Sequence, residues 1–312
     1  MKKKRKISEY DLVSRLNGSK IRFMLLFFFP AFLLYLWLFI YPIFESVQAS
    51  FTNWNGFDLT KEWVGWQNYQ NILTNDVFWG ALKNDFVIVF WKEILIGGLA
   101  LLFSFVVTHG HITKVENKIY RFLFYVPNVL SVIVITTVWT FVLNPSIGLL
   151  NGLLDVMGLQ SIIPENGWLV EYTIPWIIVI ASWCGIGTYM VLLIAAINNV
   201  PGDLYEASHL DGANQFQQFY HVTVPAIWPQ IRYLIVSVFF GTLASNMGLI
   251  LPLTGGGPDN RSMVMSLFVY QYGMNDYRVG YANAAAVIFM IISMVLSLLF
   301  NNTLQKKEDS MQ

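Results

Sequence analysis

The chain has 312 residues, of which 55% are hydrophobic and only 12% are charged, and its formal net charge is zero. Soluble domains carry about 25% charged residues, so this composition excludes an ordinary soluble protein and places the chain in a bilayer. The balanced charge gives no reason to expect nucleic acid as a partner. The single cysteine, Cys184, cannot form a disulfide within the chain.

Runs of apolar residues divide the chain into spans. A helix needs about 20 apolar residues to cross roughly 30 Å of hydrocarbon, because each residue adds about 1.5 Å. Runs of this length predict six transmembrane helices, at 22–44, 86–108, 121–143, 174–197, 232–253 and 281–303. The predicted fold class is therefore all-α, and the protein is expected to be a polytopic membrane protein.

The first span has an alternative interpretation as a cleaved signal peptide, since it follows a basic segment and precedes the triplet Val47-Gln48-Ala49. The apolar core of a signal peptide is only about 7–15 residues long, however, and this run is much longer. We therefore expect a basic tail at 1–21, a transmembrane domain at 22–303 and a second tail at 304–312.

The positions of the 19 Lys and Arg residues predict the orientation of the spans. Eight lie in 1–22, three in 109–121, one at Arg232 and two in the carboxy-terminal tail, and these segments all fall on one side of the predicted membrane. Only four lie on the other side. Because Lys and Arg accumulate in cytoplasmic segments, both termini are predicted to be cytoplasmic.

Aromatic residues are concentrated in the first segment that is predicted to lie outside, 45–85. They are Phe51, Trp54, Phe57, Trp63, Trp66, Phe78 and Trp79. Aromatic belts are normal at membrane interfaces and need no partner. Docking of an extracytoplasmic binding protein explains these residues equally well, so the sequence leaves both interpretations open.

The span 86–108 contains two charged residues, Lys92 and Glu93, and Glu93 is the one carboxylate expected inside a span. Neighbouring residues on a helix point about 100° apart, so these two need not pair directly. We expect Lys92 to extend toward the outer interface and Glu93 to find a partner on another helix. The alternative is that Glu93 couples transport to an ion gradient.

A polar stretch at 201–229 separates the fourth and fifth spans. Pro201 suits the first position of a helix, Asp203 complements the positive end of its dipole, and Gly212 permits the left-handed residue that ends it. From 198 to 231 the sequence contains no Lys or Arg. A helix on an anionic lipid surface would carry Lys and Arg, so we expect this segment to bind a protein.

The second half of the polar stretch predicts another short helix. Phe216, Phe219 and Tyr220 recur at three- and four-residue spacing and are expected to form one aromatic face. Pro225 and Pro229 are expected to break the pattern.

The stretch resembles the EAA loop of ABC-importer permeases, in which Glu-Ala-Ala, a Gly and Ile-x-Leu-Pro stand at fixed spacing. The corresponding residues here are Glu206-Ala207-Ser208, Gly212 and Val222-Thr223-Val224-Pro225, and the departures keep small or β-branched side chains. Asp203-Leu204-Tyr205-Glu206-Ala207 is similar to the carbohydrate-uptake branch, of the maltose-permease type. The resemblance implies a cytoplasmic coupling helix-turn-helix at 198–231, between helices 4 and 5. The residues implied in ATPase coupling are Tyr205, Glu206, Ala207, Ser208, Asp211, Gly212, Phe216 and Pro225.

The fourth and fifth spans are rich in small and polar residues, which helix packing explains as well as solute binding does. The resemblance implies a mid-membrane solute pathway through these spans. The corresponding positions are Gly185, Thr188, Thr242, Leu243 and Asn246. Asn246 is the strongest candidate, because an amide offers both a donor and an acceptor to a hydroxyl. Thr188 stands where the maltose-type permease has Tyr, a departure that argues against maltose itself.

The chain lacks the features of an enzyme or of a nucleotide-binding subunit. No Gly-x-x-x-x-Gly-Lys-Ser/Thr loop is present, so ATP and Mg²⁺ are expected on a separate ATPase subunit. The histidines do not show the spacing of a zinc site, and no catalytic triad is recognisable. We therefore expect no catalytic residue, cofactor or metal in this chain.

The resemblance implies a function: the transmembrane permease subunit of an ATP-driven ABC importer for a neutral carbohydrate, with an oligosaccharide favoured. The implied partners are a second homologous permease, an ABC ATPase dimer and an extracytoplasmic solute-binding protein, in a bacterial-type cell membrane. One alternative keeps the ABC machinery and changes the cargo to a polyol, a glycerol phosphate or another small solute. The other alternative is a gradient-driven carrier or a channel.

Overall fold

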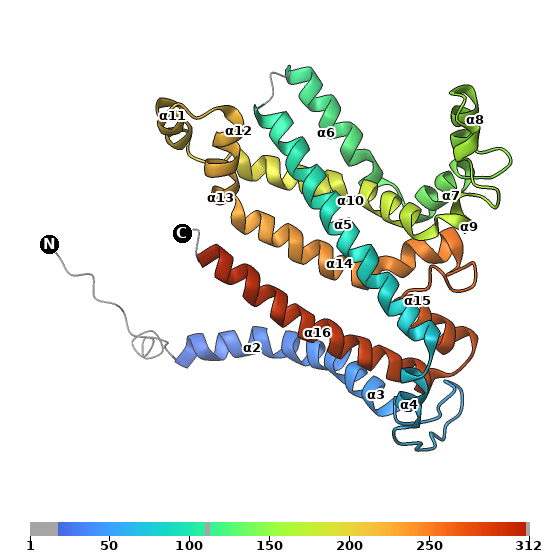
Figure 1. The fold of residues 1–312 in the computed structure, drawn as a ribbon. Coiled ribbons are helices and arrows are strands. Elements are labelled where there is room, and N and C mark those ends of the chain that lie inside the picture. Colours follow the sequence, from blue (N-terminus) through green and yellow to red (C-terminus); the bar gives the residue numbers. More distant parts are fainter. Residues whose placement is uncertain (1–17, 110–112, 310–312) are drawn as a thin grey trace.

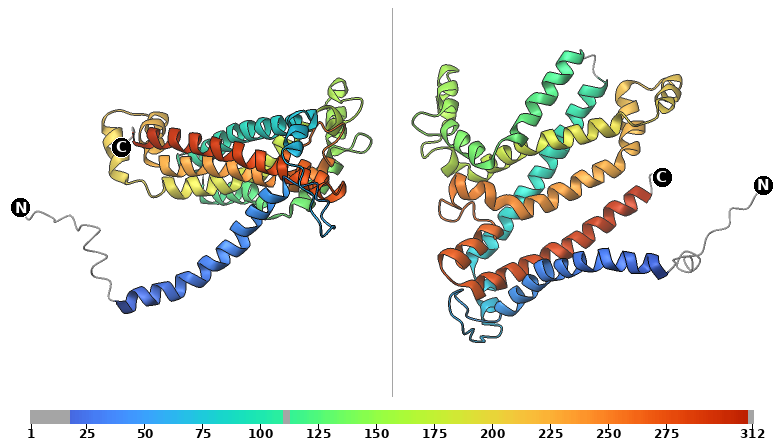
Figure 2. Two further views of the ribbon diagram at one scale, coloured as in Figure 1. Left: turned by 90° about the horizontal axis from the view of Figure 1, so that it is seen from below. Right: turned by 180° about the vertical axis from the view of Figure 1, so that it is seen from behind.

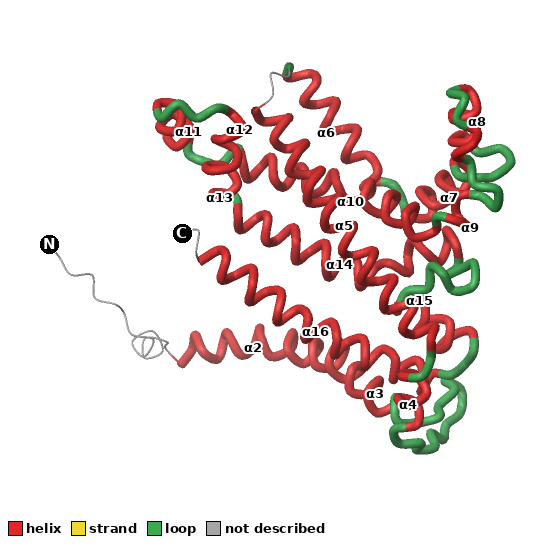
Figure 3. Tube along the Cα trace, in the orientation of Figure 1, coloured by secondary structure: helices red, strands yellow, loops and turns green. Residues whose placement is uncertain are grey.

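The computed structural model describes residues 18–109 and 113–309, and within these ranges every regular element is a helix (Figure 3). Five of the described helices or continuous helical runs are long and apolar enough to cross a membrane, and a bent helix pair supplies a sixth span if it is counted as one. The long helices are α2 (Gly18–Tyr35), α5 (Asp76–His109), α10 (Thr173–Ile197), α14 (Trp228–Thr254) and α16 (Val279–Asp309). The prediction of an all-α polytopic membrane protein is confirmed.

Short helices gather at the two ends of the bundle (Figure 1). One end carries α11 (Gly202–Leu210), α12 (Gln215–Gln218), the π-helical turn η3 (Phe219–Thr223) and α13 (Val224–Ala226). The start of α2 and the end of α16 lie toward this same end (Figure 1). The opposite end carries α4 (Gln67–Leu73), α8 (Leu149–Val156), η2 (Gln160–Ile162), α9 (Trp168–Glu171), α15 (Met265–Tyr270) and η4 (Gln271–Asn275).

The third predicted span, 121–143, is not one straight helix. The structure has α6 (Lys114–Val129) and α7 (Val132–Val142), and the two are bent by 103° at the break between them. Leu130 and Ser131 have extended backbone, with ψ of 143° and 140°, which ends α6 and redirects the chain. An apolar run reports the length of a segment and not its direction, so the bend was not predictable from composition.

Helix α10 lies at the centre of the bundle, where it packs against α5, α6 and α14. Its buried side chains Ile180, Met190 and Leu193 are fully shielded. At Gly187 the backbone of α10 approaches α6 so closely that a Cβ atom would lie 2.1 Å from the carbonyl oxygen of Phe124. Glycine at this position therefore sets how near the two helices come.

Helix α2 stands apart from the bundle. Figure 2 shows it leaving the other helices, and it continues through the π-helical turn η1 (Leu36–Ile40) into α3 (Tyr41–Ala49), which packs against α16. The most apolar part of this continuous helix buries no residue inside the chain. An isolated apolar helix is stable where lipid or another apolar helix covers it.

Candidate coupling helices and solute pathway

The structure forms the first coupling helix, α11, close to where the sequence predicts it. Asp203 lies in its first turn, and Gly212 follows its end with a left-handed φ of 82°. Pro201 is the residue before the helix, with ψ of 131°, and not its first helical residue. Proline fits this capping position as well, because its fixed φ is compatible and it has no N–H to satisfy.

The second helical segment begins with a capping box. The side chain of Asn214 accepts from the backbone N–H of Gln217, and the side chain of Gln217 accepts from the backbone N–H of Asn214, both at 2.9 Å. From there α12, η3 and α13 follow one another without an intervening loop. Pro225 lies in the first turn of α13 and Pro229 in the first turn of α14. Pro229 therefore stands at a helix start, where the missing N–H costs nothing, whereas Pro225 lies inside the continuous helical run directly after the π-helical turn η3.

One side-chain contact joins the two halves of the coupling segment. The hydroxyl oxygens of Tyr205 on α11 and Thr223 at the end of η3 are 2.9 Å apart, within hydrogen-bond distance. Thr223 is fully buried. Gln218 adds a longer contact of 3.5 Å from its Nε2 to the carbonyl oxygen of Tyr205. The hydrogen bonds make α11 and the α12–α13 segment one unit, which we call the coupling unit (residues 202–226).

The predicted aromatic face of the second helix is divided between two environments. Phe216 and Tyr220 are 68% and 63% exposed. Phe219 turns inward and packs against Phe105 of α5, with ring centroids 4.7 Å apart. The coupling unit thus presents two aromatic side chains outward and is anchored to the bundle by a third.

The predicted coupling residues lie mostly on the surface of the coupling unit. Glu206, Ala207, Asp211, Gly212 and Phe216 are exposed, and Tyr205, Ser208 and Pro225 are half-buried. A surface groove of 440 Å³ runs between the two halves of the unit. Its lining residues are Ser208, Asp211, Gly212, Ala213, Gln217, Gln218, His221 and Val222.

A cavity of 370 Å³ lies where the α6–α7 bend meets α5, α10 and α14. Most of its lining is apolar, and we call it the polar cavity because it also contains several polar side chains. Its polar lining residues are Lys92, Asn128, Cys184, Ser245 and Asn246. Gly185 also lines it. Two of the five residues predicted for the solute pathway, Gly185 and Asn246, therefore share one cavity.

The other three predicted pathway residues lie elsewhere. Thr188 is exposed and accepts a hydrogen bond from Nδ2 of Asn128, which does line the cavity. Thr242 and Leu243 are 1% and 5% exposed and are buried among packed helices instead of at the cavity wall. Thr242 lies four residues before the lining Asn246 and Leu243 three, so both share part of its face but lie one turn away, where neighbouring helices cover them. The sequence alone does not give which turn of α14 borders the cavity.

The structure also corrects the account of charged residues within the spans. Helix α5 begins at Asp76, well before the predicted start of its span, so Asp85 lies inside the helix and is fully buried. Glu93 is therefore not the only interior carboxylate. The Oε1 atom of Glu93 is buried and has no hydrogen-bond partner among the described residues.

The structure shows a contact of Lys92 that the sequence did not predict. This residue lies near the middle of α5 and lines the cavity. No carboxylate of the described residues lies within ion-pair distance of it. Asp85 and Lys92 are seven residues apart, a spacing that places both on one face of a helix. This spacing was the sequence signal that Asp85 belongs to the same helix as Lys92.

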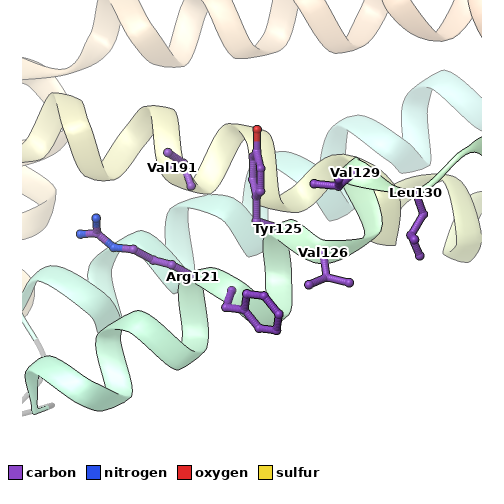
Figure 4. Close-up of a pocket in the computed structure, with 7 residues that line it drawn as sticks. Arg121, Tyr125, Val126, Val129, Leu130 and Val191 are labelled. Atoms are coloured by element: carbon purple, nitrogen blue, oxygen red, sulfur yellow. The ribbon is translucent and has the colours of Figure 1, made fainter.

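A second, apolar groove of 550 Å³ lies on the outside of the helix pair α6 and α10 (Figure 4). Val191 comes from α10, and the other lining residues are Arg121, Phe122, Tyr125, Val126, Val129 and Leu130. Phe122 and Val129 are 69% and 73% exposed. Such a surface suits hydrocarbon better than a polar solute, which leaves the polar cavity as the candidate pathway.

Comparison with known proteins decides the family. The family model described as "Binding-protein-dependent transport system inner membrane component" matches residues 100–308, which include the polar-cavity residues of α10 and α14 and the whole coupling unit. The chain belongs to this family.

Relatives within the binding-protein-dependent transport family align over most of the chain. The Bacillus subtilis "Probable ABC transporter permease protein YurN" is 34% identical over 279 residues, covering 88% of this chain and 93% of that protein. The Streptomyces coelicolor "Diacetylchitobiose uptake system permease protein NgcF" is 27% identical and covers 91% of this chain and 83% of its own length. Such relatives are permease subunits of transporters and not enzymes.

The family fold also has a counterpart among solved structures. A chain in the crystal structure of a bacterial ABC transporter "involved in the import of the acidic polysaccharide alginate" superposes with a TM-score of 0.78 and 22% identity. The match covers 92% of this chain and 98% of that chain. The overall fold of this chain therefore occurs in a solved structure.

Proposed function

We propose that this chain is the permease subunit of an ATP-driven importer that moves a neutral carbohydrate, with an oligosaccharide favoured, delivered by an extracytoplasmic binding protein. The proposal agrees with its relatives, whose names refer to diacetylchitobiose, starch degradation products and arabinooligosaccharides. A polyol, a glycerol phosphate or another small solute is the nearest alternative cargo. A gradient-driven carrier or a channel is the alternative mechanism.

One observation carries the proposal: two of the helices that wall the polar cavity, α10 and α14, are the helices that flank the coupling unit. Cys184 and Gly185 lie on α10, which ends just before the unit, and Ser245 and Asn246 lie on α14, which begins just after it. Because the unit is joined internally by Tyr205 and Thr223, a displacement of its surface is passed to both cavity helices. A motor bound to the unit can thereby change access to the cavity.

The proposed motor is a separate ABC ATPase dimer, which would hold ATP and Mg²⁺. Phe216 and Tyr220 are exposed on a unit that carries no Lys or Arg, and large exposed aromatic residues are typical of protein interfaces. In this arrangement the coupling unit and both termini face the cytoplasm of a bacterial-type cell. A second homologous permease would complete the pathway, and the apolar surface of α2 is available to it.

The cavity is suited to a polyhydroxylated solute. Asn128, Ser245 and Asn246 supply uncharged hydrogen-bonding groups, and Lys92 supplies an ammonium donor. A hydroxyl group both donates and accepts, so solute hydroxyls can pair with the uncharged groups and with the ammonium group. The solute itself then brings no charge into the cavity.

Cross-linking tests the motor. A photo-reactive residue replaces Phe216 in one variant and Leu59, which is fully exposed at the opposite end of the bundle, in a control variant. We expect the Phe216 variant to capture the ATPase and the Leu59 variant not to capture it. Capture of the ATPase at Leu59 alone would overturn the proposed orientation.

Transport in liposomes tests the mechanism and the cargo. We expect the complete importer with its binding protein to take up sugars from a panel of oligosaccharides, monosaccharides and polyols only when ATP is supplied. Sugar movement by this chain alone would establish a carrier or channel. Uptake restricted to polyols or glycerol phosphate would replace the proposed cargo.

A further inference from the structure

Two neighbouring residues on α5 hold the segment that leads into α15. The side-chain Nδ2 of Asn84 donates to the carbonyl oxygens of Arg261 and Met263, both at 2.8 Å. The Oδ2 atom of Asp85 accepts from the backbone N–H of Met265 at 2.7 Å. The segment 261–265 is therefore fixed to α5 by three short hydrogen bonds.

The second oxygen of Asp85 reaches the cavity helix α14. Its Oδ1 atom accepts from Nδ2 of Asn246 at 2.7 Å. Asp85 is fully buried and Asn246 is 5% exposed. A buried carboxylate is costly unless donors surround it, and hydrogen bonds to a charged acceptor are stronger than neutral ones. Both oxygens of Asp85 thus have a donor, one from α14 and one from the start of α15.

The chemistry of a carboxylate fixes the orientation of the Asn246 amide. An ionised carboxylate only accepts hydrogen bonds, so it turns the amide NH₂ toward itself. The carbonyl oxygen Oδ1 of Asn246 is then directed elsewhere, and no hydrogen bond from another described residue reaches it. Asn246 lines the cavity, so this oxygen is the polar atom that it can offer to a solute.

The other uncharged polar residues of the cavity follow the same pattern. The Nδ2 of Asn128 donates to Thr188, and the hydroxyl of Ser245 donates to the carbonyl oxygen of Gly241 at 2.5 Å. Each therefore donates a hydrogen bond within the protein, and its oxygen is left to accept a hydrogen bond in the cavity. Three acceptor oxygens, beside the ammonium group of Lys92, match a solute that donates from several hydroxyl groups.

We propose that Asp85 is a positioning residue for solute recognition: it holds Asn246 so that the carbonyl oxygen, and not the NH₂ group, faces the pathway and accepts from a solute hydroxyl. This role rests on the proposed solute pathway. The outer portion of α5 thereby contributes to solute specificity, although Asp85 itself does not line the cavity.

An exchange of the two side chains tests the pairing. In Asp85→Asn alone, the Asn246 amide turns over, so that its carbonyl oxygen accepts from the new NH₂ group and its own NH₂ faces the cavity, whereas Asn246→Asp alone sets two carboxylates together. In the double variant, the amide at position 85 would accept from the N–H of Met265 and donate to the carboxylate at position 246, so the network is restored with one free oxygen still on the cavity side. We expect Asn246→Asp to lower the thermal midpoint of the purified full chain by about 3 °C or more, Asp85→Asn to change it little and the double variant to recover most of the loss. A double variant as unstable as Asn246→Asp alone would overturn the pairing.

A second readout reports the direction of the free oxygen, which a purely structural role would not change. Cys184 is the only cysteine of the chain and lines the same cavity. Its reaction rates with an anionic and a cationic methanethiosulfonate are compared. Because the double variant places a carboxylate oxygen in the cavity, we expect the ratio of cationic to anionic labelling to rise about tenfold over the wild type. An unchanged ratio means that the free oxygen does not face the cavity, and the proposal fails.

Uptake separates this proposal from the proposed function. With a labelled sugar that the wild-type importer takes up, we expect Asp85→Asn to raise KM about tenfold, the effect of one lost hydrogen bond, and the double variant to restore it. If the wild type takes up no sugar of the panel, the proposed function fails. The stability and labelling results still decide the role of Asp85 in that case.

Discussion

Tyr205 and Thr223 are 18 residues apart in the chain, and their hydroxyl oxygens are 2.9 Å apart in the fold. The first belongs to α11 and the second to the segment that leads into α14. This contact, together with the longer one from Gln218 to the carbonyl oxygen of Tyr205, joins the part of the coupling unit that carries Glu206 to the part that carries Phe216. Two short helices, each too short to be stable alone, thereby form one surface that can transmit a displacement.

We predict that Tyr205→Phe weakens the coupling between ATP hydrolysis and uptake. The change removes one hydrogen bond and leaves the buried Thr223 hydroxyl without it, which costs about 1–2 kcal/mol in the stability of the unit. The number of solute molecules imported per ATP hydrolysed should fall. Tyr277→Phe, at an exposed position after η4 at the opposite end of the bundle, is the control and should leave the ratio unchanged. Equal ratios in the two variants would contradict the prediction.

We predict that Gly212→Ala disrupts the turn between the two halves of the unit. Gly212 has a φ of 82°, where a Cβ atom costs about 1–2 kcal/mol, although the surrounding space is open. Gly202→Ala, at the start of α11, has equal space and no left-handed backbone, so it is the matched control. Co-purification of the ATPase with the permease should decrease for the first variant only. Loss in both variants would point to the bulk of the methyl group instead of the backbone.

We predict that Gly187→Ala separates α10 from α6. The new Cβ would lie 2.1 Å from the carbonyl oxygen of Phe124, so the helices must move apart, at a cost of about 1–3 kcal/mol in the free energy of unfolding. Gly241→Ala, in α14 with no atom within 4 Å of the added carbon, is the control. It should be neutral or stabilising by up to about 1 kcal/mol, because alanine favours a helix more than glycine does. Thermal unfolding of the full chain in detergent measures both.

We predict that Lys92 sets the charge preference of the cavity. No Asp or Glu is among the cavity-lining residues, so Cys184 of the wild type should react faster with an anionic than with a cationic methanethiosulfonate. Lys92→Gln should reduce this preference about tenfold, as expected when a unit charge a few ångströms away is lost. Lys83→Gln removes a charge from an exposed position of the same helix and should change little. A preference unaffected by Lys92→Gln would mean that its ammonium group points out of the cavity.

The sequence by itself determined those structural features that depend on residues close to one another in the chain. Spans were predictable because bilayer thickness sets the length of an apolar run. The end of α11 was predictable because glycine, here Gly212, adopts a left-handed backbone at low cost, and the coupling unit was recognisable from the spacing of Glu206, Gly212 and Pro225.

Tertiary structure alone decided which of these residues meet. The bend after Val129, the burial of Asp85, and the placing of Thr242 and Leu243 among packed helices all depend on the direction and rotation of whole helices. Those quantities follow from close approaches such as Gly187 to Phe124 and from distant pairs such as Asp85 and Asn246. An apolar helix is equally apolar on every side, so its sequence determines that it crosses the membrane. Only the packing of neighbouring helices determines which of its faces lines the cavity.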